Sequence, residues 1–217
     1  MKKKYGWIPS FIREALVAVR NYIRRLKGRR ELLALSHQPV KRIIIGSEGD
    51  KFEGWVTTEQ DVLDLLTVAD WHQFFIINSL DAILAEHVWE HLTPNEGVVA
   101  AKNCFDFLKP GGHIRIAVPD GYHPEADYIK QVKPGGSGAG ADDHKVLYTH
   151  KSLSKIFISV GFEVSLLEYF DENGEFIEEK WNASEGFIER SKHFDSRNTS
   201  DKLNYTSIIL DAVKPLR

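Results

Sequence analysis

The stretch Leu80–Leu92, which reads LDAILAEHVWEHL, decides the fold that we predict for this chain. Its first half, Leu80–Ala85, is apolar except for Asp81 and has the length of one buried strand. Four titratable side chains follow directly: Glu86, His87, Glu90 and His91. Ligands of an open parallel α/β sheet bind beyond the carboxyl ends of its strands, so this cluster marks one wall of a candidate site.

The chain after this stretch predicts a helix and a second strand. Residues Pro94–Leu108 show helical apolar spacing, and the sequence KPGG at 109–112 ends the helix. The β-rich run His113–Val118 follows and stops at the sequence PDG. A strand, a helix and a strand in this order indicate an α/β protein with a parallel sheet.

The segments DAILAEHVWEHL (81–92) and LKPGGHIRIAVPDG (108–121) resemble the fourth and fifth strands of class I S-adenosylmethionine-dependent methyltransferases. They are most similar to the methyltransferases predicted from cell-surface polysaccharide gene clusters, and the resemblance extends from about Lys41 to Pro215. It implies a three-layer, Rossmann-like α/β fold with a mostly parallel seven-stranded sheet. Its last strand, Tyr205–Val213, would run antiparallel between the fifth and sixth strands. It also implies S-adenosylmethionine as cofactor and O-methylation of a sugar or related surface-polysaccharide precursor.

The other strands are predicted on both sides of this unit. They are Val40–Ile45, Trp55–Thr58, Asp61–Leu65 and Phe162–Glu168, and a further helix runs from Ser152 to Val160. Only nine residues, 46–54, separate the first two strands, whereas a parallel crossover usually needs a dozen or more. We therefore expect the first crossover helix to be shortened or absent, which leaves sheet surface that an N-terminal helix can cover.

The resemblance places the cofactor across the ends of the first, second and fourth strands. The glycine-rich turn of the family is reduced here to Gly46 and Gly49, in the sequence GSEG. Glu59 matches the acid that accepts hydrogen bonds from the ribose hydroxyls, and Asp64 matches the residue that contacts the adenine amino group. The implied cofactor-binding residues are Gly46, Ser47, Glu48, Gly49, Glu59, Asp64, Glu86 and His87.

The acceptor side is predicted from the polar residues after the fifth strand. His144, in the segment Asp142–Tyr148, is our candidate general base, with His87, Glu86 and Asp120 as alternatives. A solvated loop residue is an equally good interpretation of His144. The predicted substrate-binding residues are Asp120, His123 and Tyr148. Residues 170–198 form a long polar excursion that we interpret as a substrate-side insertion.

Two other functions fit parts of the sequence. HVWEH at 87–91 matches the H-x-x-E-H pattern of inverted zinc peptidases. We disfavour that function because the pair lies where a strand meets a helix, and we predict no metal site. A methyltransferase fold that has lost catalysis and acts as a binding or scaffolding module is the main alternative, since the glycine turn is degraded and the first crossover is short.

Composition describes an ordinary globular protein of 217 residues, with 42% hydrophobic and 27% charged residues. The lone Cys104 excludes an internal disulfide and favours a reducing compartment, so we expect a cytoplasmic location. The length suits one methyltransferase-like domain over residues 37–217, preceded by a basic region over residues 1–36.

The N-terminal region differs in charge from the rest of the chain. Residues 1–30 carry ten Lys or Arg against the single acid Glu14, whereas the whole chain has a net charge of −3. Apolar residues from Phe11 to Leu26 recur at helical spacing, which predicts a basic amphipathic helix over residues 7–27. This helix suits the anionic inner face of a membrane, with Trp7 and Phe11 as interfacial anchors. Packing of the stripe against the sheet or a second copy in a homo-oligomer is an equal alternative, and nucleic acid is disfavoured because the remaining chain is acidic.

Overall fold

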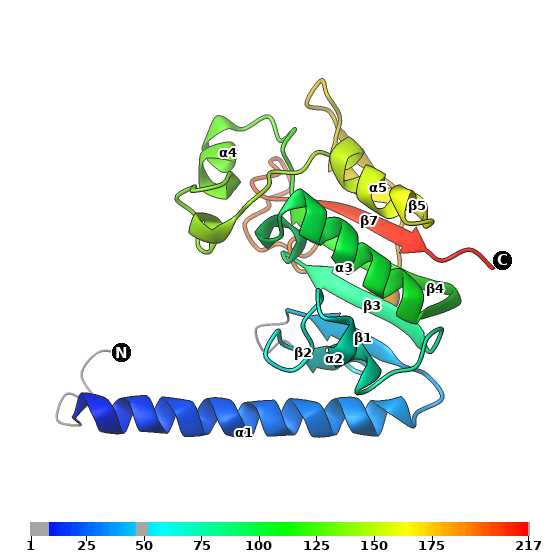
Figure 1. Cartoon of the computed structure of the whole chain (residues 1–217). Helices are drawn as coiled ribbons and strands as arrows, with labels where there is room; N and C mark the ends of the chain where they lie inside the picture. Colours follow the sequence, from blue (N-terminus) through cyan, green and yellow to red (C-terminus); the bar gives the residue numbers. More distant parts are fainter. Residues whose placement is uncertain (1–8, 47–51, 217) are drawn as a thin grey trace.

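The computed structural model describes residues 9–46 and 52–216, and a seven-stranded sheet runs through its centre (Figure 1). The strand order is β2-β1-β3-β4-β7-β5-β6. The strands are β1 (Arg42–Ile45), β2 (Val56–Thr58), β3 (Leu80–Glu86), β4 (Leu108–Pro119), β5 (Glu163–Phe170), β6 (Phe176–Glu178) and β7 (Ser207–Val213).

The directions of the strands confirm the predicted topology. β2, β1, β3 and β4 are mutually parallel neighbours. β7, the last strand of the chain, pairs antiparallel with β4 on one side and with β5 on the other. The register places Ile83 opposite both Ile43 and Ile114, and Ile114 opposite Ala212. One apolar row therefore crosses the centre of the sheet, as the alternation of side chains along each strand requires.

The predicted strand Asp61–Leu65 was wrong. The amides of Val62 and Leu63 both donate to the Glu59 carbonyl oxygen, and the Asp64 carboxylate accepts from the Leu66 amide at 2.8 Å. These local bonds form consecutive turns, which compete with strand pairing for the same backbone groups. The seventh strand is instead β6, which pairs antiparallel with β5 inside the segment predicted as an insertion.

Five α-helices and three short 3₁₀ helices are described. They are α1 (Ser10–Ser36), α2 (Val68–His72), α3 (Pro94–Phe107), α4 (Ala126–Val132), α5 (His150–Ser159), η1 (Trp89–His91), η2 (Ala141–Asp143) and η3 (Ala183–Glu185). The predicted α3 is confirmed, and its start is set by a capping box between Thr93 and Glu96 with Pro94 in the first turn. The first crossover was expected to have a shortened helix or none. Its described residues, Gly46 and 52–55, form no helix.

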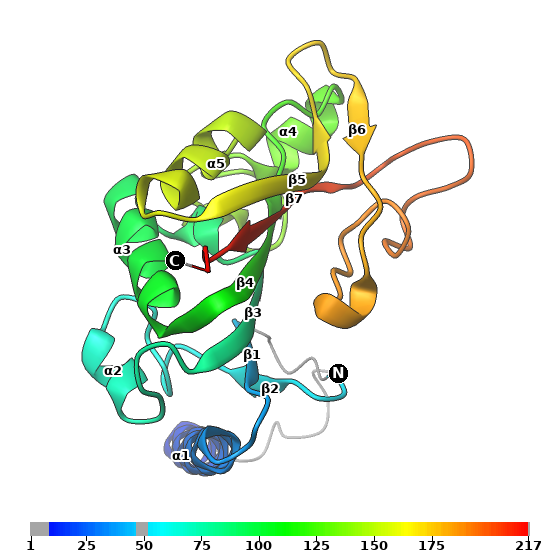
Figure 2. The same cartoon turned by 90° about the vertical axis from the view of Figure 1, so that its right-hand side faces the viewer.

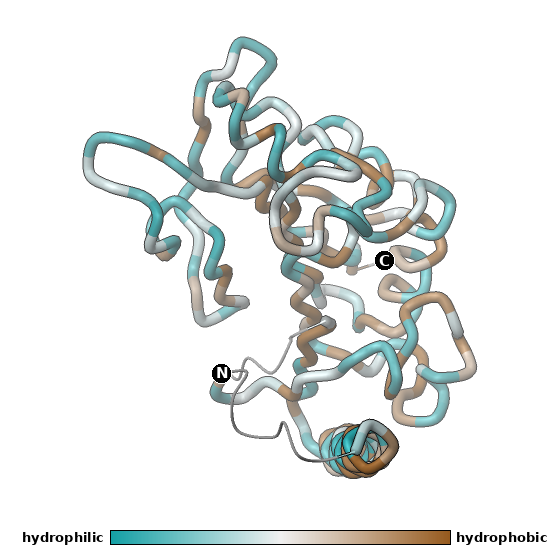
Figure 3. Tube along the Cα trace, turned by 90° about the vertical axis from the view of Figure 1, so that its left-hand side faces the viewer, coloured by the Kyte–Doolittle hydropathy of each residue, from teal (hydrophilic) through white to brown (hydrophobic). Residues whose placement is uncertain are grey.

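One face of the sheet packs against helices α3 and α5 (Figure 2). Ile83, Ile114 and Leu210 point to this side and meet Phe107 and Phe157. The hydrophobic segments gather in the central strands, which Figure 3 shows in brown. This face holds most of the apolar core, whose removal from water is the main stabilising contribution.

The opposite face packs against irregular chain rather than helices. Ile44, Leu84 and Ile209 point to this side and contact Ile188 and Trp181. The third layer of the fold is thus formed by the excursion after β6, seen beside the sheet in Figure 2. The N-terminal helix does not lie on this face. The C-terminal part of α1 packs beside β2 instead, where Leu32 and Leu35 join the core with Ile43 and Ile45, so the expectation that this helix covers sheet surface is confirmed only for that part.

Arg115 of β4 joins the sheet to this irregular layer. Its side chain is 1% exposed and makes a two-pronged ion pair with Asp211 of β7, with both N–O distances 2.8 Å. The same guanidinium donates to the carbonyl oxygens of Asn182 at 2.8 Å and Gly186 at 2.7 Å. A planar guanidinium with five donors suits such a junction.

A second charged residue on the sheet binds the same layer further along the chain. Glu168 of β5 is fully buried and accepts from the Lys192 amide at 2.7 Å and from the Trp181 indole at 2.9 Å. Burial raises the pKa of Glu168, and these two donors oppose the rise. Specific hydrogen bonds therefore hold the excursion on the sheet, and they explain how a polar segment adopts one defined conformation.

Helix α1 packs against the domain only through its C-terminal part. Leu32 and Leu35 are buried, and Arg24 forms an ion pair with Asp61 at 3.1 Å. Phe11 and Tyr22 are 68% and 63% exposed, so the predicted apolar stripe does not pack against the domain, and α1 extends past the sheet (Figure 1). Packing of this stripe against the sheet is therefore contradicted. Among the described residues, no helix has the length and apolar character needed to cross a membrane.

Candidate functional site

Two adjoining cavities lie beyond the carboxyl ends of β1, β2 and β3. The first, of about 250 Å³, is the histidine cavity, and it includes Glu86, His144 and Arg190. The second, of about 450 Å³, is the carboxylate cavity, and it includes Glu59 and Asp64. The two cavities share four lining residues: Ile45, Gly46, His87 and His91. The structure thus brings most of the predicted cofactor-binding residues to one edge of the sheet.

Gly46 sits where β1 enters the shared wall of the two cavities. Its φ is +65°, and a Cβ at this position would lie 2.8 Å from Cγ2 of Val88. Both facts require glycine and leave the backbone open to close approach by a ligand. The predicted residues Ser47, Glu48 and Gly49 lie outside the described part of the chain.

The carboxylate cavity combines two acids with an apolar wall. Glu59 follows β2 directly, as predicted, and Asp64 lies in the turn that replaces the predicted third strand. Leu63 and Leu65, both buried, line the same space. Acceptors beside an apolar surface suit a ligand with hydroxyl groups on one part and a flat ring on another.

Glu86 borders the histidine cavity at the end of β3, but its carboxylate already has partners. One oxygen accepts from the Arg190 amide at 2.8 Å and the other from the Glu189 amide at 3.1 Å. Burial raises the pKa of Glu86, while these backbone donors favour its charged form. Glu86 therefore holds residues 189–190 over the cavity, a contact that sequence reasoning missed.

His87 lies in the wall between the two cavities. Its backbone has φ +55°, uncommon for a residue with a side chain, and its amide donates to the Ala117 carbonyl oxygen at 2.8 Å. Nε2 lies 3.1 Å from the Ser207 hydroxyl, and Nδ1 lies 3.2 Å from Oε1 of Glu90. Burial lowers the pKa of His87 well below its ordinary value, so the imidazole is neutral at neutral pH.

His144 reaches the histidine cavity from the segment after η2. Its Nδ1 lies 2.6 Å from the Val132 carbonyl oxygen, so Nδ1 carries the proton and donates it. Nε2 is therefore the nitrogen with a free lone pair. Burial lowers the pKa of His144, which keeps the ring neutral. The solvated-loop interpretation of His144 is wrong, because the side chain is buried against His91, with ring centroids 4.8 Å apart.

Glu90, His91 and Arg190 are neighbours of the site for which the sequence indicated no individual cofactor-binding or catalytic role. Glu90 is 1% exposed, and burial raises its pKa to about 8. His91 lines both cavities and Arg190 lines the histidine cavity. Glu90 and His91 belong to the polar cluster in the stretch Leu80–Leu92. The orientation of their side chains depends on η1, which is too short to predict from apolar spacing.

Residues 87–91, which match the zinc-peptidase pattern, do not form the helix that this motif requires. That motif needs one helix to carry both histidines on the same face. Here only Trp89–His91 is helical, as a single 3₁₀ turn, and His87 precedes it with positive φ. The structure therefore gives no support to the peptidase interpretation of residues 87–91.

The predicted substrate-binding residues do not line either cavity. Asp120 is fully buried and accepts from the amides of Tyr122 at 2.9 Å and Phe170 at 2.7 Å. The His123 ring stacks on Tyr128 with centroids 3.9 Å apart, and burial lowers the pKa of His123 to about 4. The Tyr148 side chain is also buried.

Tyr148 packs beneath α3, where its hydroxyl lies 3.4 Å from the position of a Cβ at Gly97. Burial raises the pKa of Tyr148 to about 12. Its carbonyl oxygen accepts from the Gly121 amide at 2.7 Å. None of Asp120, His123 and Tyr148 lines either cavity, so their observed contacts are those of packing and turn formation.

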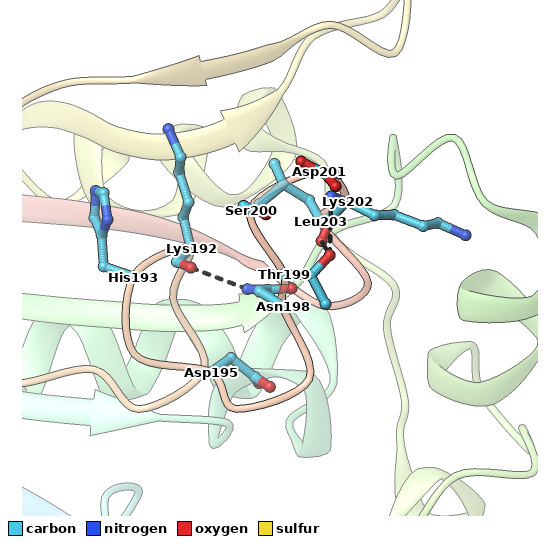
Figure 4. Close-up of a pocket in the computed structure, with 9 residues that line it drawn as sticks. All are labelled: Lys192, His193, Asp195, Asn198, Thr199, Ser200, Asp201, Lys202 and Leu203. Atoms are coloured by element: carbon cyan, nitrogen blue, oxygen red, sulfur yellow. Dashed lines mark hydrogen bonds between the residues drawn. The ribbon is translucent and has the colours of Figure 1, made fainter.

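A further pocket of about 450 Å³ lies in the loop of residues 192–203 (Figure 4). Nδ2 of the Asn198 side chain donates to the Lys192 carbonyl oxygen at 3.1 Å across it, and Asp195 pairs with Arg197. These bonds stabilise the loop itself. The pocket contains no residue predicted to bind cofactor or substrate.

Among solved structures, several methyltransferases are similar to this chain at low sequence identity. No family model matches the chain, and no curated protein sequence matches it. A SAM-dependent methyltransferase from Thermotoga maritima is 14% identical with a TM-score of 0.49, and the alignment covers 90% of this chain and 96% of that one. A SAM-dependent methyltransferase from Archaeoglobus fulgidus is 16% identical with a TM-score of 0.46, covering 88% and 92%.

The strand order and the antiparallel β7 between β4 and β5 decide the architecture. The fold is that of class I methyltransferases. A methyltransferase of Haloferax volcanii, solved with the activator Trm112, is 13% identical with a TM-score of 0.47 and covers 91% and 96% of the two chains. At these identities the comparisons concern the fold, so the reaction of this methyltransferase-fold chain has to be inferred from its site.

Proposed function

We propose that this chain is an S-adenosylmethionine-dependent methyltransferase that O-methylates a sugar or a related surface-polysaccharide precursor. The observation that carries the proposal is the junction of two cavities at Gly46, His87 and His91. One cavity has the acceptors and apolar wall expected for a nucleoside. The other has neutral imidazoles suited to an acceptor hydroxyl. A methyl donor and its acceptor need such adjoining spaces, because the reacting atoms must be aligned with water excluded.

The residues of the carboxylate cavity fit the nucleoside part of the cofactor. The missing Cβ of Gly46 permits close approach to the backbone, and the Glu59 carboxylate can accept from two ribose hydroxyls at once. Leu63 and Leu65 offer an apolar wall for the adenine ring. When bound, S-adenosylmethionine supplies an electrophilic methyl group.

His144 is proposed as the group that removes the proton from the acceptor hydroxyl. Its Nδ1–H is held by the Val132 carbonyl oxygen, which fixes the tautomer and leaves the Nε2 lone pair for the proton. The lowered pKa of His144 keeps this lone pair free at neutral pH. Arg190, fixed through its amide to Glu86, contributes to the wall of the same cavity.

Titration calorimetry with S-adenosylhomocysteine tests the cofactor site. We expect Glu59→Ala to weaken binding by about 1–3 kcal/mol, because hydrogen bonds to a charged acceptor are lost. The control Glu53→Ala alters an exposed acid outside both cavities and should bind like wild type. An unchanged dissociation constant for Glu59→Ala removes this residue from the site, and no binding by the wild-type protein overturns the proposed cofactor.

A non-catalytic binding module is the second candidate function. The hydrogen bonds that Glu86 makes within the protein favour it. That carboxylate bonds to the amides of residues 189–190 instead of being free for a ligand. The two functions differ in one measurement. Transfer of labelled methyl from S-adenosylmethionine to sugar acceptors, lost in His144→Ala, supports the enzyme. Cofactor binding with no transfer to any acceptor tested supports the module.

We also propose that α1 lies on the anionic cytoplasmic face of a membrane, where lipid-linked sugar precursors would meet the enzyme. Its apolar side chains, including Leu16 at 57% and Ile23 at 59% exposure, are not covered by the domain. Arg13, Arg20 and Arg25 are exposed on the same helix. An apolar stripe flanked by arginines is the pattern of an interfacial helix.

A further inference from the structure

Three side chains from two distant segments converge beside the histidine cavity. Glu90, His91 and His144 each offer one ligand atom, and these atoms all lie within 4.8 Å of one another. Backbone bonds keep the two segments together, because the amides of Lys145 and Val146 donate to the Glu90 carbonyl oxygen at 2.7 and 3.2 Å. The convergence is therefore built into the fold and does not depend on the side chains alone.

The Glu90 carboxylate lacks the hydrogen bonds that a buried acid normally has. Its side chain is 1% exposed, and neither oxygen has a hydrogen-bond partner within residues 9–46 and 52–216. His87 is an ionisable neighbour, and its Nδ1 lies 3.2 Å from Oε1. Buried polar groups are rarely left in this state, and an acid that faces a cluster of nitrogens can be satisfied by a cation.

Both imidazoles of the cluster are arranged with one nitrogen held and the other free. His144 donates from Nδ1 to the Val132 carbonyl oxygen at 2.6 Å. Nδ1 of His91 lies 3.5 Å from Oδ2 of Asp143. In metal sites, a ligating histidine usually gives its second N–H to a carbonyl or carboxylate oxygen, which fixes the ring and its tautomer. Nε2 of each ring is then available to a metal ion.

We infer that Glu90, His91 and His144 bind one divalent transition-metal ion of the Zn²⁺ type. Two imidazole nitrogens and one carboxylate oxygen are a ligand set of open zinc sites, which keep a fourth position for another ligand. Nitrogen ligands also make Mg²⁺ and Ca²⁺ poor occupants. This inference replaces the prediction that the chain has no metal site.

The distances allow the site to close around the ion. Ligand atoms around tetrahedral zinc lie roughly 3.4 Å apart at ordinary bond lengths. The longest separation in the cluster is no more than 4.8 Å, so a contraction of little more than an ångström is needed. His91, whose side chain is 33% exposed, has room to rotate, whereas Glu90 is fixed by burial.

The position of the cluster gives the ion a role in the proposed reaction, and only this consequence rests on the proposed function. His91 and His144 line the histidine cavity, so the fourth position of the ion can take an oxygen of the acceptor. With the ion bound, Nε2 of His144 would be a ligand instead of the proton acceptor, and the ion would serve to orient the acceptor oxygen. Metal binding itself needs neither the cofactor nor methyl transfer.

Titration of the full-length, tag-free protein with Zn²⁺ alone, after treatment with a chelator, tests the site by calorimetry. We expect one ion per chain with micromolar or tighter affinity. His91→Ala and His144→Ala should each weaken binding by roughly a hundredfold or more, and Asp143→Asn by roughly tenfold through loss of the orienting carboxylate. The matched control His37→Ala removes an exposed histidine at the end of α1 and should leave the affinity unchanged.

Cobalt provides a second measurement on the same proteins. Substitution with Co²⁺ should give the visible absorption of a tetrahedral nitrogen and oxygen site in wild type, and Glu90→Gln should alter it while far-ultraviolet circular dichroism stays native. No zinc binding at micromolar concentrations, or binding that survives both histidine substitutions, overturns the site. A separate titration with S-adenosylhomocysteine distinguishes this failure from failure of the proposed function.

Discussion

The roles of single acids at the strand ends are decided by the groups that surround them. Glu86 comes at the end of β3, where a ligand-binding acid was predicted, yet its oxygens hold the amides of residues 189 and 190. Asp120 comes at the end of β4 and uses both oxygens on backbone amides. A carboxylate at a strand end can thus accept hydrogen bonds from a ligand or from the backbone of a loop, because both present N–H or O–H donors.

Asp120 should make the stability of the protein depend on pH. Burial raises its pKa from 3.8 to about 6, although two amides and the nearby His150 favour the charged form. The folded state therefore binds the proton more tightly than the unfolded state. This stabilisation is complete below pH 3.8 and is lost as the pH rises through about 6, a change of about 3 kcal/mol in the free energy of unfolding.

Chemical denaturation of wild type and Asp120→Asn over this pH range measures the effect. The variant also loses one accepted amide bond, which lowers its stability by a constant amount. The difference between the two free energies of unfolding should therefore change with pH, with wild type losing stability relative to the variant as the pH rises. Parallel curves would contradict the raised pKa of Asp120.

Among the elements, α1 differs most from an ordinary helix of this fold. It is 27 residues long, and only Leu32 and Leu35 are described as buried. Helices in proteins owe most of their stability to the packing of their apolar face and not to intrinsic propensity, so an exposed apolar stripe calls for a surface that covers it. The basic composition of the same helix makes an anionic lipid surface the proposed one.

Liposome co-sedimentation tests the contact of α1 with lipid. We expect the triple variant Arg13→Gln, Arg20→Gln, Arg25→Gln to bind anionic vesicles more weakly, because each base near such a surface contributes about 1 kcal/mol. Wild-type binding should also fall as salt is raised. The control removes three exposed lysines of the domain, through Lys133→Gln, Lys155→Gln and Lys180→Gln. Equal losses in both variants would argue against α1 as the lipid-binding element.

At the scale of the whole molecule, buried charges join the sheet to its irregular third layer. Arg115 and Glu168 reach this layer from β4 and β5, and Glu86 reaches it from β3. Apolar contacts through Ile188 and Trp181 accompany them. The excursion after β6 therefore has one defined course over the sheet, and it completes the wall of the histidine cavity through Arg190.

Loss of Arg115 should destabilise the whole protein. We expect Arg115→Met to lower the free energy of unfolding by about 3 kcal/mol, because Asp211 loses its partner in a buried setting. Chemical denaturation measures this, and limited proteolysis should show faster cleavage within residues 179–195. The double variant Arg115→Met, Asp211→Leu should regain part of the stability.

A matched exposed pair provides the comparison. Lys130→Met breaks the surface pair with Asp127 and should change the free energy of unfolding by no more than about 0.5 kcal/mol. If Arg115→Met costs as little as Lys130→Met, the sheet is not joined to the third layer through this guanidinium.

The sequence by itself determined the α/β class, the helix α3 with its flanking strands, and the strand ends that border the site. These features follow from local signals: an apolar run, a capping box at Thr93 and a glycine turn at Gly46. Spacing could not show that Asp61–Leu65 forms turns, because hydrogen bonds to the side chain of Asp64 and the carbonyl of Glu59 compete with strand pairing there.

Only the tertiary structure decided which polar groups meet. His91 and His144 lie far apart in the chain, and their contact depends on the path of the loop through η2 and on the two amides that bond to the Glu90 carbonyl oxygen. The hydrogen-bond partners of the Glu86 carboxylate depend likewise on the position of residues 189–190. Such paths carry no periodic signal, since each is set by a few hydrogen bonds between distant segments and not by a repeating apolar face.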